Sequence, residues 1–422
     1  MKPNPIVAPV ILALLLSPVT AHALSLAEAE QAMQVQNPEL EAARIELRGA
    51  QGDLLAARRR PPAELALGTS KISPLEGVGS GRWQHKRMDS TLGLGWTWER
   101  GGKRRLRIGT AQAGADAAAL ELLDSQRQQR LALHEAYFGV KAAQLHLQVA
   151  QENRAASARA LAAAELQLTS GAIAPIERNR LAVEDLKVEA ESHVAEQELL
   201  EARSELALLI GHSAALEQLS ADDPWPALLS GGMLEPAPGA LEQRADLLAA
   251  QARVDAADAA RALARSQRRR DVQLGLEAER EPTDIGGVSW GMSISVPLNG
   301  PNHYRGEWQR AEADYDAAVL ERNRLRSEAR LQLLQVQQQL QAANVRLAQY
   351  EQQLLPAARQ ALDGMELAYR RGAATLTDLL DARRTWREAD SDLIDARLLH
   401  AVTLARWQAL GTLPSLQGTP SR

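Results

Sequence analysis

The sequence has 422 residues, no cysteine, 3% aromatic residues and a formal net charge of −5. Without cysteine the chain has no disulfide, no thiolate metal ligand, no cysteine nucleophile and no lipid-modified N-terminal cysteine. The small negative charge excludes a general nucleic-acid partner. Ala, Leu, Gln, Glu and Arg dominate, which is typical of long packed helices.

Residues 1–23 are predicted to be a secretory signal peptide. Lys2 supplies a positive start, residues 6–16 are apolar, and Ala21-His22-Ala23 matches the small-residue cleavage pattern. The apolar stretch is shorter than the roughly 20 residues that a helix needs to cross a bilayer. The mature chain is therefore expected to begin near Leu24.

Residues 24–211 are predicted to form a first structural repeat. Apolar residues recur at three- and four-residue steps from Leu26 onward, until Pro61-Pro62 ends the helix. Two short strands follow, and then two helices joined by a turn at Gly171. The expected elements are a helix over 26–60, strands over about 64–72 and 91–99, and helices over 102–170 and 176–211.

Residues 212–240 are rich in Pro and Gly, so we expect a linker or equatorial region with little regular structure. Residues 241–411 then form a second structural repeat, and residues 412–422 a disordered tail. Pro356 is expected to kink the long helix of this copy. The predicted elements are a helix over 241–270, strands over about 271–279 and 289–298, and helices over 302–371 and 375–410.

The repeat has a period of about 200 residues. Gly171-Ala172 is matched by Gly372-Ala373, and Leu209-Ile210-Gly211 by Ala409-Leu410-Gly411. A helix of about 69 residues is roughly 100 Å long, and two shorter helices of roughly 50 Å placed end to end match it. Helices whose lengths match in this way can form the wall of a cylinder of even height. The repeat therefore indicates a conduit. Two unrelated long coiled coils remain an alternative.

The four short strands alternate between an apolar and a polar face. At nine or ten residues each has the length of a tilted strand that crosses a bilayer, with lipid on one side and water on the other. Trp83 lies beside them and fits an interfacial aromatic belt. A hairpin packed on helices would alternate in the same way, so that alternative stays open. The expected membrane-facing residues are Leu92, Leu94, Trp96, Trp98, Trp290, Met292, Ile294 and Val296.

Four strands cannot close a barrel, and each unpaired backbone group on an open edge costs several kcal/mol in lipid. Chains must therefore combine if these strands span a membrane. Eight strands leave hardly any interior space, whereas twelve leave a passage. The strands favour a trimer or a larger assembly.

Together these features resemble the TolC-type outer-membrane efflux family over nearly all of residues 24–411. The most specific part is the turn at Gly372, which is followed six residues later by Asp378-Leu379-Leu380-Asp381-Ala382. Leu355-Pro356 and the junction at 296–300 are also similar to the family. In the first copy Asn179 stands where the second has Leu380, so the first tip departs from the pattern of the family. In its chain length and its lack of a lipid-anchor cysteine, the chain is similar to members of the heavy-metal cation efflux branch.

The resemblance implies a mostly α fold with a small β part, made of two tandem repeats. Three chains would form a homotrimer with a twelve-stranded barrel in outer-membrane lipid and a helical barrel in the periplasm. The tips at Gly171 and Gly372 would contact a periplasmic adaptor (membrane fusion) protein and an inner-membrane pump. Such a channel is a passive conduit for small solutes or metal cations, with no catalytic residue, cofactor or resident metal.

A conduit needs a constriction, and rings of carboxylates are a usual way to favour cations there. Asp378 and Asp381 are three residues apart near the second tip, and Glu177 occupies the matching place in the first. We expect some of these acids to line the constriction. Each could equally cap or flank the start of a helix, where negative charge is favourable.

Two arginine runs, 58–60 and 268–270, lie at matching helix ends just before strands. They could complement helix dipoles or touch lipid headgroups. The histidines, including His85 and His303 near the hairpins, lack metal-ligand spacing. No nucleotide-binding or hydrolase motif is present, so an enzyme is not expected. A soluble periplasmic coiled-coil adaptor or scaffold, and the outer-membrane component of type I protein secretion, remain as alternative functions.

Overall fold

The computed structural model of the chain describes residues 23–72, 75, 77–82, 86–211, 216, 219–229, 239, 241–281, 287–298, 300 and 302–411. The predicted signal peptide up to residue 22 and the predicted tail 412–422 lie outside the described residues, as do Trp83, His85 and most of 212–240. The helices of the first repeat are α1 (Leu26–Gln36), α2 (Pro38–Ala57), α3 (Lys103–Thr169) and α4 (Pro175–Ile210). Those of the second are α5 (Ala245–Ser266), α6 (Arg305–Gln349), α7 (Leu355–Arg370) and α8 (Leu376–Gly411).

The prediction of one helix over 26–60 was wrong at Asn37. The backbone of Asn37 is extended, and its side chain accepts a hydrogen bond from the Leu40 N–H at 3.0 Å. Pro38 then occupies the first position of α2, where its missing N–H is not needed. Asn-Pro is a stop-and-restart signal within an otherwise helical pattern. The apolar periodicity continues across it, which is why the periodicity alone predicted one helix.

Pro356 interrupts the long helix of the second repeat. The five residues Tyr350–Leu354 are π-helical and separate α6 from α7. Pro356 has no N–H to donate to the carbonyl four residues earlier. The Leu355 N–H reaches back five residues to the Tyr350 carbonyl, which is the wider spacing of a π turn. The predicted break is therefore present as a change of helix type.

The chain divides into two compact units that are not the two repeats. Unit 1 combines residues up to 35 with 133–228 and 346–402, and unit 2 combines 36–132 with 229–345 and the residues from 403 onward. Each unit takes segments from both repeats, and α3, α6 and α8 contribute to both. The two units are described separately below.

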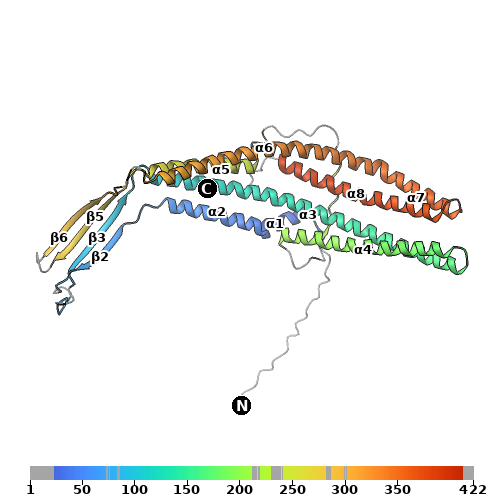
Figure 1. Cartoon of the computed structure of the whole chain (residues 1–422), viewed down its shortest axis with the longest axis horizontal. Helices are drawn as coiled ribbons and strands as arrows, with labels where there is room; N and C mark the ends of the chain where they lie inside the picture. Colours follow the sequence, from blue (N-terminus) through green and yellow to red (C-terminus); the bar gives the residue numbers. More distant parts are fainter. Residues whose placement is uncertain are drawn as a thin grey trace, which may run out of the picture. The chain divides into compact units, whose positions relative to one another are not determined.

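Unit 2 contains a four-stranded antiparallel sheet in the order β2-β3-β5-β6 (Figure 1). The strands are β2 (Glu64–Ser70), β3 (Asp89–Trp98), β5 (Val272–Glu281) and β6 (Gly287–Ser295). All four predicted strands are present, with ends shifted by up to three residues. β6 ends at Ser295 rather than 298, so Val296 lies one residue beyond it. Pro297 has no N–H for a strand ladder, which fits this early end.

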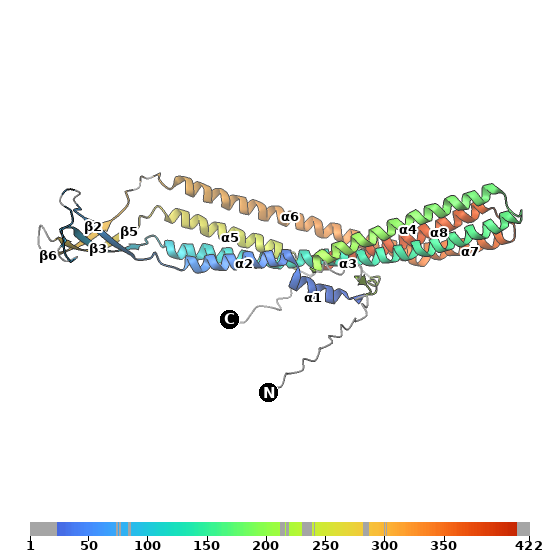
Figure 2. The ribbon, with the colours of Figure 1, turned by 90° about the horizontal axis from the view of Figure 1, so that it is seen from below.

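Unit 1 contains two helical hairpins, α3–α4 and α7–α8, that lie side by side (Figure 2). Their ends share a core of Ala164, Leu181 and Leu376, against which Tyr369 and Leu380 pack. Leu181 supplies an apolar side chain from the first hairpin, two positions after Asn179. The first tip is therefore packed in spite of the polar residue at 179.

The N-terminal end of the described chain is held in unit 1. β1 (Ala23–Leu24) pairs in parallel with β4 (Ser220–Ala221), so part of the predicted linker is a short strand. The fully buried Tyr137 donates its hydroxyl hydrogen to the Leu24 carbonyl at 2.8 Å and accepts from the Asp223 N–H at 3.2 Å. Burial is the main cause that raises the pKa of Tyr137, to about 12. Tyr137 therefore stays neutral and joins the two segments.

Candidate functional site: the two faces of the sheet and the helix tips

One face of the sheet is apolar over four successive rows. Residues that are direct partners across strands lie on the same face, so the strand registers fix its composition. Trp290 is 82% exposed and Met292 79%, although both are large apolar side chains. The apolar rows of this face are Leu67–Leu92–Ala278–Trp290, Leu65–Leu94–Leu276–Met292, Trp96–Leu274–Ile294 and Trp98–Val272. Beyond Leu92 the same side continues with the mixed row Thr69–Ser90–Arg280–Val288, where the apolar surface ends. Proteins that stay in water rarely expose so large an apolar patch, so this face needs a nonpolar partner.

The opposite face is small, polar and acidic. Its rows are Gly68–Thr91–Glu279–Ser289, Ala66–Gly93–Glu277–Gly291, Glu64–Gly95–Gly275–Ser293 and Thr97–Gln273–Ser295. A Cβ atom added at Gly275 would lie 2.5 Å from the Ser293 Oγ, so a larger residue there requires the Ser293 hydroxyl to rotate away. The face bears carboxylates and no basic residue in these rows. It can line water and attract cations.

The predicted membrane-facing residues fall on one face, as expected. Leu92, Leu94, Trp96 and Trp98 of β3 and Trp290, Met292 and Ile294 of β6 are all exposed and lie on the apolar face. Val296 is exposed too, but it lies after the last residue of β6. The pairing of β3 with β5, which joins the two repeats into one sheet, was not evident from the local alternation.

The two tips have the same backbone turn. Gly171 and Gly372 adopt left-handed conformations with φ of 76° and 72°. In each tip the next residue donates its N–H to the carbonyl five residues earlier, Ala172 to Gln167 at 2.8 Å and Ala373 to Ala368 at 2.9 Å. This is the way in which a helix ends at a glycine. Glycine is needed at both positions because other residues rarely adopt this conformation.

The acids predicted for the constriction have different environments. Asp378 forms a capping box, in which its Oδ2 accepts from the Thr375 N–H at 2.9 Å and hydroxyl at 2.7 Å, while its own N–H donates to the Thr375 Oγ at 3.2 Å. These hydrogen bonds hold the pKa of Asp378 below its usual range. Asp381 is exposed and lies 3.5 Å from Arg384. Glu177 is half-buried in the first turn of α4.

Ion pairs connect the helices near the tips. Arg387 of α8 lies 2.6 Å from Glu184 and 3.8 Å from Glu191, both on α4, so it joins the two hairpins. Arg180 of α4 donates to the Thr377 hydroxyl at 3.1 Å, a second link between them. The Arg387 side chain is only 18% exposed, which strengthens its pairing relative to a solvated one. Helical periodicity gave no indication of these pairs.

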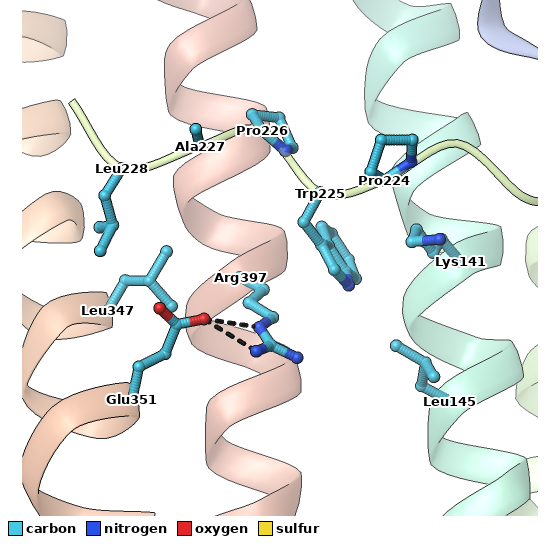
Figure 3. A pocket seen from close by; sticks show the side chains of 10 residues that line it. All are labelled: Lys141, Leu145, Pro224, Trp225, Pro226, Ala227, Leu228, Leu347, Glu351 and Arg397. Carbon is cyan, nitrogen blue, oxygen red and sulfur yellow. Dashed lines mark hydrogen bonds and ion pairs between the residues drawn. The ribbon is translucent and has the colours of Figure 1, made fainter.

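A cavity of about 520 Å³ in unit 1 is covered by the segment 224–228 (Figure 3). Trp225 projects from this segment toward the helices, stacks on Phe138 at 5.7 Å, and lies under the Lys141 ammonium at 5.8 Å. Arg397 and Glu351 form an ion pair at 2.8 Å on the opposite wall. The cavity results from the way in which this irregular segment packs on α3 and α8.

Among the described residues, no three His, Asp or Glu side chains are grouped so that they could hold a metal ion. No helix in the described part of the chain is long and apolar enough to cross a membrane.

The fold and the two-faced sheet define a class of membrane channel, and comparison with known proteins agrees. Residues 30–212 and 238–411 match the family described as outer membrane efflux protein, so the chain belongs to that family. It is the outer-membrane channel component of a tripartite efflux system, a passive conduit rather than an enzyme, with its helical part in the periplasm.

The chain is 26% identical over 387 residues to the cobalt-zinc-cadmium resistance protein CzcC of Cupriavidus metallidurans, covering 90% of this chain and 87% of the relative. Among solved structures, a membrane protein from Pseudomonas aeruginosa is similar with a TM-score of 0.79 and 18% identity, covering 92% of this chain and 90% of the other. The outer membrane protein VceC of Vibrio cholerae is similar with a TM-score of 0.75 and 22% identity, covering 92% and 96%. Because these sequence identities are low, the two solved structures support the fold alone.

Proposed function

We propose that three copies of this chain close a twelve-stranded barrel in the outer membrane and that the resulting channel exports metal cations. The observation that carries the proposal is the division of one sheet into an apolar and an acidic face. β2 and β6 are the sheet's edges. Unpaired backbone groups cost several kcal/mol each in lipid, so β6 of one chain pairs with β2 of the next.

The number of chains in the assembly follows from the space inside the barrel. A barrel of eight strands is filled by its own side chains, whereas twelve strands leave a water-filled passage. The residues of the polar face are small, which also keeps a passage open. Each chain adds Glu64, Glu277 and Glu279 to this lining. Rings of such carboxylates favour cations over anions.

Metal cations are the preferred cargo because the acidic lining is combined with similarity to a protein named for cobalt, zinc and cadmium resistance. Export of other small solutes through the same channel is the alternative. The tips, with Gly171 and Gly372, are the proposed contact surface for the adaptor protein and the inner-membrane pump. Their exposed turns leave the backbone accessible.

At the tips we propose that Glu177 and Asp381 line the constriction. Asp378 occupies the same region, but its carboxylate already accepts hydrogen bonds from Thr375. Its contribution to the constriction is therefore expected to be smaller than that of Asp381. Arg387 keeps the hairpins together while the channel is closed.

Bilayer recordings test the cation lining. The reversal potential in a potassium chloride gradient gives the cation-to-anion permeability ratio, and zinc chloride gives the corresponding ratio for a divalent cation. Both should favour the cation in the unmodified channel. Glu277→Gln with Glu279→Gln should bring both ratios toward those of an unselective pore without loss of conductance.

Asp381→Ala and Asp378→Ala, measured separately in the same recordings, test the tip. The cation preference should fall more with Asp381→Ala. An unmodified channel that prefers chloride would contradict the metal-cation proposal. Unchanged permeability in both tip variants would remove these residues from the constriction.

A further inference from the structure

Basic residues are concentrated where the helices of unit 2 meet the sheet. The windows 58–60, 99–107 and 268–271 together hold eleven Lys and Arg residues and only two acids. All three windows belong to unit 2. They follow the end of α2, connect β3 to α3, and connect α5 to β5. The concentration of like charge in one place needs an explanation, because like charges repel.

Lys103, Arg104 and Arg107 have structural roles. Arg104 donates to the Arg58 carbonyl at 2.7 Å, and Arg107 to the Arg59 carbonyl at 3.1 Å, so both satisfy carbonyls beyond the C-terminal end of α2. Arg107 also pairs with Glu99 at 2.6 Å, and Lys103 with Asp271 at 2.9 Å. Glu99 and Asp271, the two acids of these windows, are therefore both ion-paired.

Contacts of this kind do not explain why positions 100 and 105 carry arginine. Both are exposed, and within the described residues no carboxylate lies at ion-pair distance from either side chain. Arg100 lies three residues before α3 and Arg105 lies in its first turn, which has no acidic residue. Positive charge at a helix N-terminus is unfavourable because the helix dipole is positive there. The arginine runs 58–60 and 268–270 differ, because they lie at helix C-termini.

Arg100 comes two residues after the last residue of β3, at the end of the apolar face. Trp98 and Val272 form the last pair of β3 and β5 and lie on the apolar face. β3 ends at Trp98 and β5 begins at Val272. If the alternation of the strands continues for two residues, Arg100 and Arg270 point to the same side as this pair. The Arg100 N–H donates to the Asp271 carboxylate at 2.9 Å, so the two segments are still adjacent at this level. Glu99, between them, has the opposite orientation and pairs with Arg107.

A left-handed turn lies beside the arginines that follow α5. Gly101 has φ of 75°, and a Cβ added there would lie 2.8 Å from the Arg269 Cβ. The Gly101 backbone and the Arg269 side chain are therefore in contact. We call residues 58–60, 100, 105 and 268–270 the basic collar. It begins directly after Trp98, the last residue of β3 on the apolar face.

We propose that the basic collar binds the phosphate groups of anionic phospholipids in the periplasmic leaflet of the outer membrane. Tryptophan marks the boundary between hydrocarbon and headgroups, and the guanidinium group matches phosphate with two parallel hydrogen bonds. The helices lie in the periplasm, so this end of the sheet meets the inner leaflet, which consists of phospholipids. The proposal rests on the membrane position of the sheet and is independent of the exported ion.

Native mass spectrometry of the purified channel in detergent tests the collar. Phosphatidylglycerol and phosphatidylcholine are titrated separately, and the bound lipids per particle give an apparent dissociation constant for each. The unmodified channel should prefer phosphatidylglycerol. Arg100→Gln with Arg105→Gln should weaken phosphatidylglycerol binding at least about fivefold, the size typical of one basic residue at an anionic lipid surface, and leave phosphatidylcholine unchanged.

A matched control removes the same charge elsewhere. Arg326 and Arg330 of α6 are exposed, and Arg326→Gln with Arg330→Gln should leave the lipid preference as it is. Arg100→Lys with Arg105→Lys keeps the charge and should retain most of the preference. The spectrum also counts protein chains, so dissociation of the channel is distinguished from loss of lipid. Single Arg100→Gln and Arg105→Gln variants replace the double variant if it dissociates.

Several results would overturn the proposal. Equal affinity of the unmodified channel for both lipids would do so, as would an unchanged preference in the glutamine variant. Displacement by lipid A at lower concentration than by phosphatidylglycerol would assign the collar to the outer leaflet. Displacement by millimolar inorganic phosphate would assign it to free phosphate instead of a membrane.

Discussion

The sheet of unit 2 and the tips of unit 1 are specified by different physical means. In the sheet the same alternation is repeated in four strands, so many residues contribute to one two-faced surface. At the tips two glycine turns are alike, but the links between the hairpins depend on a few side chains such as Arg387 and Arg180. A membrane wall needs a permanent structure, whereas a constriction must be able to open.

The largest effect is expected from a charge on the apolar face of the sheet. Leu276→Arg places a cation in the middle of that face and should destabilise the inserted barrel by about 2–4 kcal/mol in each chain. Glu277→Arg, at the neighbouring residue on the other face, should leave insertion intact. Recovery of folded channel from the outer membrane measures both. Equal recovery of the two variants would show that the faces are not lipid and water.

Arg387 is expected to have the largest effect at the tips. Arg387→Gln removes contacts to two acids of the other hairpin and should weaken the closed state by about 1.5–3 kcal/mol in each chain. Single-channel recordings should show more frequent or larger openings. Arg384→Gln is the control, because Arg384 is exposed and its ion-pair partners among the described residues, Asp381 and Glu388, belong to its own helix. If both variants behave like the unmodified channel, Arg387 does not hold the tips closed.

Within unit 1 the N-terminal segment is attached by Tyr137. Tyr137→Phe removes two hydrogen bonds at a buried position and should reduce stability by about 1–2 kcal/mol. The pKa of Tyr137 is raised in the folded protein, to about 12 from 10.0, so the unfolded chain loses this proton first. The stabilisation should be complete below pH 10 and decrease as the pH rises toward 12. Thermal unfolding of both proteins across this range measures it, and identical pH profiles would contradict it.

The smallest effect distinguishes the two tips from each other. The second tip has the Thr375–Asp378 capping box, whereas the first has Ala174 without a side-chain cap and Pro175 at the helix start. Asp378→Ala should therefore lower the unfolding temperature slightly, because it removes one half of the capping box. Because its folded pKa lies below the usual 3.8, the stabilisation is present above that pH and is lost as the pH falls further. Glu177→Ala in the first tip should have a smaller effect on thermal stability.

The sequence predicted the sheet better than the tips because strand alternation is a local signal. The four strands, their faces and both glycine turns could be read from spacing alone. The break at Asn37 was missed because apolar periodicity continues across it. The β1–β4 pair and the link by Tyr137 join segments more than 80 residues apart, and Arg387 pairs with acids about 200 residues away. Such distant contacts have no periodic signature.

The most direct test of the account is the mass and image of the particle extracted from the outer membrane with detergent. Native mass spectrometry should give three chains per particle, and electron microscopy should show a closed barrel of twelve strands around an open passage. A stable single chain that dissolves in buffer without detergent would contradict the assignment of the sheet to a shared membrane barrel.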